Sequence, residues 1–71
     1  MESFRIRPAD NRLPSIINLK VIMDFNSYSV LRDGAKISHL RYNNDSWEQT
    51  VGELTQDEII QVGQAIESRY I

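Results

Sequence analysis

The chain contains no cysteine, and this removes two of the usual ways to stabilise a very small protein. Without thiols there is neither a disulfide framework nor a thiolate metal site. His39 is the single histidine, so the usual imidazole sites for zinc or copper are excluded as well. We expect no metal and no cofactor. We expect the 71 residues to be stabilised by tight packing of a small core or by a partner subunit.

A long apolar run is also missing. The longest apolar stretch, at residues 16–23, is interrupted by Asn18 and Lys20, so we expect no segment to cross a membrane. The first 15 residues hold five charged side chains and no apolar core typical of a secretion signal. These absences predict a cytoplasmic protein with no membrane partner.

The excess of charge is small, at a net −2, which disfavours a general nucleic-acid binder. The charges are unevenly distributed, however. Residues 1–44 carry a net +3, whereas residues 45–71 carry a net −5. We interpret this as a basic sheet and an acidic helix with solvated outer faces. The alternative is a pair of complementary faces that associate between subunits or recognise a charged partner.

The apolar pattern predicts a single α+β domain. We expect an antiparallel meander of three or four strands with one C-terminal amphipathic helix packed on one face. Residues 1–15 are predicted to form an N-terminal arm, in which Phe4 and Ile6 alternate with charged residues, and residues 16–71 to form the domain. The strands are predicted at residues 16–25, 28–32, 36–42 and 46–51.

The first of these strands has the clearest alternation. One parity is apolar throughout and is predicted to face the helix: Ile17, Leu19, Val21, Met23 and Phe25. Ile16 and Ile22 then point to the opposite face of the sheet. We expect that face to be covered by the arm, through Phe4 and Ile6, or by a second subunit.

Turn residues separate the strands. Turns are predicted at Asn26-Ser27, at Asp33-Gly34 and at residues 43–45. Asp33-Gly34 is the strongest hairpin signal, but a two-residue and a three-residue turn place different residues opposite Val30. The register, and with it the facing of Ile37, Leu40 and Tyr42, therefore stays open.

The helix is predicted over residues 55–70. Thr55 and Glu58 form a capping box, and Leu54 and Ile59 are spaced as a hydrophobic staple. A single apolar stripe follows, made of Ile59, Val62, Gly63, Ile66 and Tyr70. Gly63 costs about 1 kcal/mol relative to alanine inside a helix, so we expect the helix to approach the sheet closely there.

No motif of catalysis or cofactor binding is found, so we do not expect an enzyme. Ser38 precedes His39, but adjacent strand residues point to opposite faces. Asp57 and Glu58 are explained by helix capping and the helix dipole. None of the three glycines belongs to a phosphate-binding loop.

The remaining function is interaction. We predict a small non-catalytic protein-interaction, accessory or regulatory protein, with a homodimer as one form. The candidate interaction surface consists of Ile16, Ile22, Arg32, Arg41 and Tyr42. The alternative partner is nucleic acid, bound by arginines of the sheet and the arm, with Tyr42 as a base-stacking side chain.

The order of structural motifs over residues 28–70 resembles that of small bacterial proteins of unknown function. The resemblance implies a β-meander followed by one helix, and no functional residue. The motifs are Asp33-Gly34, Trp47-Glu48, Gly52-Glu53-Leu54-Thr55 and Val62-Gly63-x-x-Ile66-Glu67.

Overall fold

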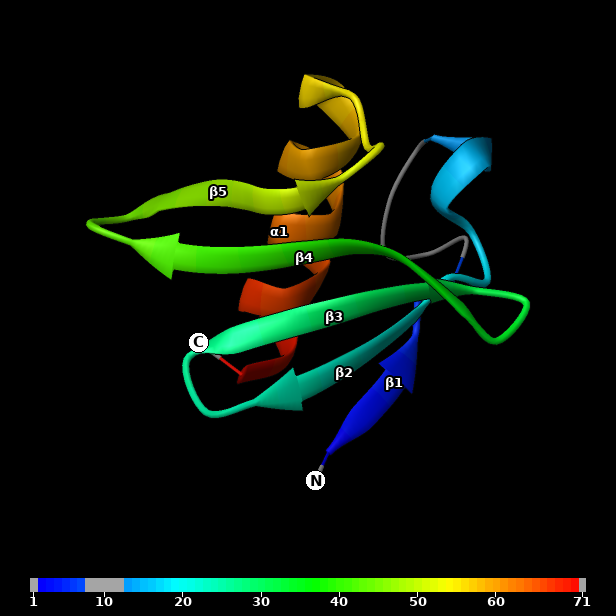
Figure 1. The fold of residues 1–71 in the computed structure, drawn as a ribbon, viewed down its shortest axis with the longest axis horizontal. Coiled ribbons are helices and arrows are strands. Elements are labelled where there is room, and N and C mark those ends of the chain that lie inside the picture. Colours follow the sequence, from blue (N-terminus) through cyan, green and yellow to red (C-terminus); the bar gives the residue numbers. More distant parts are fainter. Residues whose placement is uncertain (1, 8–12, 71) are drawn as a thin grey trace.

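Five antiparallel strands and one helix make up the fold. The computed structural model describes residues 2–7 and 13–70 of the chain. The elements are β1 (Ser3–Arg5), the 3-10 helix η2 (Pro14–Ile16), β2 (Lys20–Asp24), β3 (Ser27–Arg32), β4 (Ala35–Asn43), β5 (Ser46–Gly52) and α1 (Gln56–Tyr70). The strands lie in the order β1-β2-β3-β4-β5, and α1 crosses behind them in Figure 1. The predicted α+β meander with one C-terminal helix is confirmed, with one strand more than expected.

The additional strand comes from the predicted arm. Ser3–Arg5 pair with β2, and Phe4 and Ile6 are buried among the core residues. The Ile6 N–H donates to the carbonyl of Leu19 at 2.9 Å, which continues the pairing beyond β1. The predicted boundary after residue 15 therefore does not separate an arm from the domain. Phe4 and Ile6 also lie on the helix side, so they do not cover the opposite face as expected. Residues 8–12 of the predicted arm fall outside the described residues.

The strand predicted at residues 16–25 is shorter than expected at both ends. Pro14 starts a turn of 3-10 helix, a position that suits its fixed φ, and Asn18 has φ +72°. Ile16 is consequently fully buried in η2 and does not point to the opposite face of the sheet. At the other end, Phe25 leaves the strand for the turn and is 95% exposed. Leu19 and Val21 reach the core as predicted.

The β3–β4 hairpin has the two-residue turn that Asp33-Gly34 indicates. Both residues have positive φ, at +53° and +82°, and Arg32 pairs with Ala35. A bulge at Ile37 then shifts the register, so that Val30 lies opposite Ser38. The bulge determines which side chains of β4 face the helix. Leu40 is fully buried on the helix side of the sheet.

The core lies between the sheet and α1, and the first turn of α1 is capped. The predicted capping box is present: Thr55 N–H donates to Glu58 Oε1 at 2.8 Å, and Glu58 N–H donates to Thr55 Oγ1 at 3.2 Å. The buried residues are Phe4, Ile6, Ile16, Leu19, Val21, Tyr28, Val30, Leu40, Leu54, Ile59, Val62, Ala65 and Ile66. Among the described residues, no helix has the length and apolar character required to cross a membrane.

The helix and the sheet are in tight contact at Gly63, through the side chain of Trp47. A Cβ built on Gly63 would clash with the indole of Trp47, which reaches across from β5. The Trp47 Nε1–H donates to Glu67 Oε2 at 3.0 Å, one helical turn beyond Gly63. A side chain at position 63 would therefore displace the indole and break this hydrogen bond.

Aromatic rings extend this contact over the helix side of the sheet. Trp47 meets Tyr28 at 5.3 Å and Tyr42 at 4.8 Å between ring centroids. Tyr70, in the last turn of α1, stacks on Tyr28 and meets Phe4 edge-on. These contacts hold the C-terminal half of the helix against strands β1, β3 and β5.

We predict that Gly63→Ala destabilises the protein, although alanine is the better helix former by about 1 kcal/mol. The reason is the collision with Trp47. In a Trp47→Leu background the same substitution should be markedly less harmful, and it should gain up to about 1 kcal/mol if the space opens fully. Urea unfolding of the four proteins tests this coupling. An equal effect of Gly63→Ala in both backgrounds would show that the two residues do not interact.

We also predict that Glu58 makes the stability dependent on pH. The N–H of Thr55, and then the hydroxyl of Ser15, hold the pKa of the Glu58 carboxyl below its ordinary value. A lowered pKa in the folded state adds stability above the unfolded pKa, and this stability is lost as the pH falls through the lowered value. Glu58→Gln should therefore lower the urea midpoint at pH 7 and have little effect near pH 2. Asp57→Asn is the control, and a loss that persists at low pH would contradict the assignment.

Candidate interaction surface

One face of the sheet is not covered by any described element. The helix packs on the face that holds Val21, Val30 and Leu40, and the other face, which we name the open face, is turned toward the viewer in Figure 1. From the strand pairing, the open face carries Ser3, Arg5, Lys20, Ile22, Asp24, Ser27, Ser29, Leu31, Lys36, His39, Arg41, Glu48 and Val51. It is therefore a mixed surface, with a few half-buried apolar residues among charged ones.

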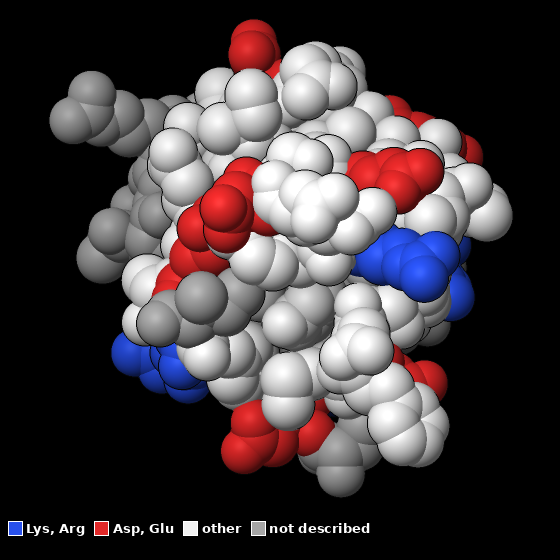
Figure 2. Space-filling view, turned by 90° about the vertical axis from the view of Figure 1, so that its left-hand side faces the viewer, with Lys and Arg blue, Asp and Glu red and all other residues white. Residues whose placement is uncertain are grey.

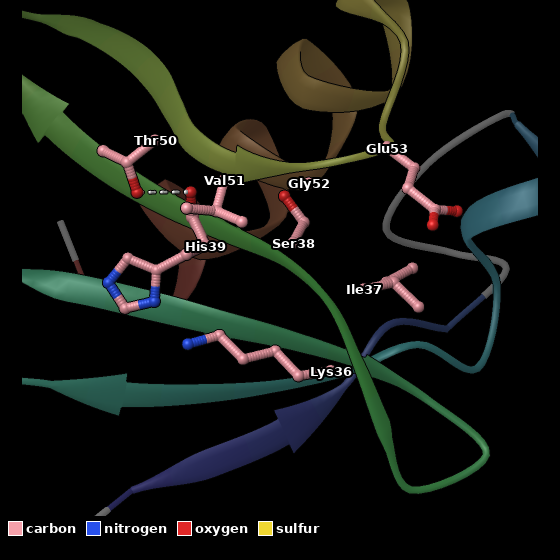
Figure 3. Close-up of a pocket in the computed structure, with 8 residues that line it drawn as sticks. All are labelled: Lys36, Ile37, Ser38, His39, Thr50, Val51, Gly52 and Glu53. Atoms are coloured by element: carbon pink, nitrogen blue, oxygen red, sulfur yellow. Dashed lines mark hydrogen bonds between the residues drawn. The ribbon is translucent and has the colours of Figure 1, made fainter.

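A hollow of about 460 Å³ lies on this face, toward the end of β5. Two bulges border the hollow, one at Ile37 in β4 and one at Thr50 in β5. The second is seen in the pairing, because His39 pairs with Val51 whereas Leu40 pairs with Gln49. Bulges bend a strand and redirect its side chains, and they are frequent beside binding sites. Figure 3 shows the lining residues, which are Lys36, Ile37, Ser38, His39, Thr50, Val51, Gly52 and Glu53.

A polar network fastens the base of the hollow to the start of the helix. Ser38, which is buried, donates its hydroxyl to Gln49 Oε1 at 2.6 Å. The same amide group accepts the Leu54 N–H at 2.9 Å and donates to the Leu54 carbonyl at 3.1 Å. Gly52 is required here, because it has φ +142° and a Cβ would lie 2.6 Å from Ser38 Cα. The end of β5 is thus rigidly positioned.

The hollow lacks the geometry of a catalytic site. His39 points to the open face and Ser38 to the core, as the alternation predicts. Ser29 Oγ on β3 contacts His39 Nδ1 at 3.5 Å, which is the long limit of a hydrogen bond. No carboxylate of the described residues hydrogen-bonds the ring, so a nucleophile–base–carboxylate set is not assembled. The described residues likewise contain no cluster of three His, Asp or Glu side chains that could hold a metal ion.

Two tyrosines have raised pKa values, both for reasons of packing. Burial, and then the neighbouring Tyr70, raises the pKa of Tyr28. Removal from solvent, and then the hydrogen bond to Asp45, raises the pKa of Tyr42. Both phenols therefore stay neutral at physiological pH and act as packing residues with a polar end.

Strand β5 forms the more accessible edge of the sheet. The other edge strand, β1, has three residues, and Arg5 in it donates to the carbonyl of Asn18 at 3.2 Å. By contrast β5 has seven residues, contains neither lysine nor proline, and pairs on its outer side with no strand of the described part of the chain. β5 lacks three common protections of an edge strand, which are lysine, proline and short length, and it carries two others, the charge of Glu48 and the bulge at Thr50.

Exposed apolar side chains flank this edge on both faces. Val51 is 71% exposed on the open face. On the helix side, Ile60 is 43% exposed and precedes Gly63 and Glu67 by three and seven residues. It therefore shares the stripe of α1 that meets Trp47 of β5. An added strand would find apolar surface on either side.

The five residues predicted as an interaction surface do not form one. Ile16 is fully buried in η2, and Tyr42 lies on the helix side against Trp47. Arg32 donates to the carbonyl of Ser15 at 2.9 Å, at the far end of β3. Only Ile22 and Arg41 share the open face, on strands β2 and β4. The prediction from strand alternation was wrong for Ile16, because Pro14–Ile16 form a turn of 3-10 helix and not part of a strand.

The arginines considered for nucleic-acid binding are also dispersed. Arg5 lies on β1 and Arg41 on β4, Arg32 is directed at η2, and Arg12 falls outside the described residues. Figure 2 shows one end of the molecule, on which acidic and basic side chains are interspersed among uncharged ones and no continuous basic area is present. Phe25 lines a hollow together with Arg41, but Arg5 on β1 and Arg32 beside η2 do not line it.

Sequence reasoning missed the exposure of Val51 and Phe25, the two most exposed large apolar side chains among the described residues. By strand alternation Val51 would lie on the same face as Trp47, which is the helix side. The bulge at Thr50 turns Val51 to the open face. Phe25 had the parity of Val21 but occupies the β2–β3 turn with φ +52°. The neighbouring Asn26 was the available turn signal, and it indicated a position one residue later.

We predict that Phe25 opposes stability. A side chain at positive φ costs about 1 kcal/mol, and at 95% exposure Phe25 gains little burial in return. Phe25→Asn should raise the free energy of unfolding by about 1 kcal/mol, because asparagine tolerates this conformation. Phe25→Ala, which keeps the strain, should leave it nearly unchanged. Thermal and urea unfolding measure both, and an equal gain from the two variants would contradict the strain argument.

Comparisons with known proteins add no relative. Searches with the chain against protein-family models, curated proteins and solved structures found no match. The resemblance to small bacterial proteins stays a prediction.

Proposed function

We propose that the protein is a small non-catalytic interaction module that binds an extended segment of another protein along β5. The observation that carries this proposal is the state of that edge. It has seven residues without lysine or proline, and exposed Val51 and Ile60 flank it on the two faces. Addition of a strand would satisfy the outward backbone groups of β5 and cover both apolar side chains.

The rigidity of the edge supports the same proposal. The contact of Trp47 with Gly63 and the hydrogen bonds of Gln49 to Leu54 tie β5 to α1. An edge that is already ordered loses little conformational entropy when a segment binds. The absence of cysteine suits a reducing compartment, and we place the module in the cytoplasm on that basis.

Selection from a displayed library of peptides about ten residues long tests the proposal. The full chain is immobilised, and enriched peptides are then measured by fluorescence anisotropy against the wild type, Val51→Lys and Ser3→Lys. We expect enriched peptides to alternate apolar and polar residues. Val51→Lys should weaken their binding at least about tenfold, because lysine protects an edge strand. Ser3→Lys, on the opposite edge, should have no effect.

Three outcomes would overturn the proposal. The first is the enrichment of no peptide, and the second is peptide binding that is indifferent to Val51→Lys. The third is salt-sensitive binding of labelled single-stranded DNA that Val51→Lys strengthens, since added positive charge favours nucleic acid. This last result would support the nucleic-acid alternative.

A further inference from the structure

The charges along β5 specify what kind of segment this edge accepts. We propose that the partner segment is basic, with Lys or Arg at two positions four residues apart and an apolar residue midway between them. This inference rests on the proposed function, since it assumes that a strand adds to β5. It deepens that proposal by assigning the chemistry of the partner.

Three side chains in a row along the edge carry the inference. Glu48 and Val51 are successive open-face positions, because the bulge at Thr50 removes one residue from the alternation. Glu53 follows, and its N–H donates to the Ile37 carbonyl at 3.2 Å, so pairing with β4 continues past Gly52. Glu53 also lines the same hollow as Val51. An added strand therefore faces the order acidic, apolar, acidic.

Both carboxylates are available to a partner. Neither Glu48 nor Glu53 forms an ion pair or a side-chain hydrogen bond with a described residue. Arg41 lies directly opposite Glu48 on β4 yet makes no ion pair with it. An added strand would lie at the same spacing on the outer side of β5, on the side away from Arg41 and Lys36 of β4. Opposite charges at directly paired positions stabilise a sheet, and like charges destabilise it.

The spacing of the partner's charges follows from strand geometry. Side chains on one face of a strand recur every second residue. Residues opposite Glu48, Val51 and Glu53 are thus at positions i, i+2 and i+4 of the partner. The pattern is Lys or Arg, then an apolar residue, then Lys or Arg, with β-forming residues between.

The same charges disfavour a second copy at this edge. Antiparallel pairing of two β5 strands would bring Glu48 and Glu53 of both copies onto one short shared face. Two further acidic residues lie beside β5 on its helix side, where Glu67 accepts the N–H of Trp47 and Asp45 accepts the hydroxyl of Tyr42. Residues 45–71 carry a net −5, with Arg69 as their single cation. A basic segment of another chain relieves this repulsion, and an identical strand adds to it.

Two synthetic peptides of about ten residues test the inference. Their central residues are Lys-Thr-Val-Thr-Lys in one and Glu-Thr-Val-Thr-Glu in the other, with identical uncharged flanks. Anisotropy titrations at low salt compare their binding to the wild type, Glu48→Lys and Asp24→Lys. Asp24 is the matched control because it lies in the same row of the open face as Glu48, but on β2.

We expect the wild type to bind the lysine peptide at least about tenfold more tightly than the glutamate peptide. The preference should shrink with added salt, because salt screens exposed charges. Glu48→Lys should weaken binding of the lysine peptide and strengthen that of the glutamate peptide. Asp24→Lys should leave the preference in place. A gain in binding of the glutamate peptide on Glu48→Lys is a result that loss of folding cannot produce.

The failures of the two proposals can be told apart. Equal binding of both peptides, abolished by Val51→Lys, would overturn the charge pattern and leave strand addition intact. Failure of both peptides while library-selected peptides still bind at the edge would also overturn the pattern. Concentration-dependent self-association that Glu48→Lys alters would replace the basic partner with a second copy. Failure of all peptides would overturn the proposed function itself.

Discussion

The contact between the Trp47 indole and the bare backbone of Gly63 determines how the helix sits on the sheet. The indole fills the space that a side chain at position 63 would need, and Glu67 accepts its N–H. Tyr28 and Tyr42 pack against the indole, and Tyr70 stacks on Tyr28. In a 71-residue chain without cysteine, this cluster takes the role that a disulfide or a metal has in other small domains.

The same contact divides the molecule into a closed side and an open side. Because a single helix covers one face of five strands, the other face and the β5 edge meet solvent in the described structure. The edge is nevertheless fixed in place. Trp47 hydrogen-bonds to Glu67 of α1, and Gln49 hydrogen-bonds to Leu54, which precedes α1. An edge strand that is ordered and that no other element covers is suited to pairing with an added strand.

The exposed apolar residues support the same conclusion as the β5 edge. A hairpin tip with a bare aromatic at positive φ, and a valine turned outward by a bulge, both lower stability or solubility. The chain keeps them beside carboxylates that have no described partner. A protein selected only for folding would place asparagine or glycine at position 25 and lysine in the edge strand.

What the sequence determined by itself was local. Capping of the helix by Thr55 and Glu58, the Asp33-Gly34 turn, the place of Gly63 in the apolar stripe and the alternation of Leu19 and Val21 depend on neighbours a few residues apart. The tertiary structure decided the rest: that Ile16 is buried, that Trp47 is the partner of Gly63, and that bulges at Ile37 and Thr50 redirect the strands toward a hollow. A bulge has no strong residue signature, and it shifts every later side chain to the other face. The register, and therefore the surface, is set by packing between strands and helix, which no single segment encodes.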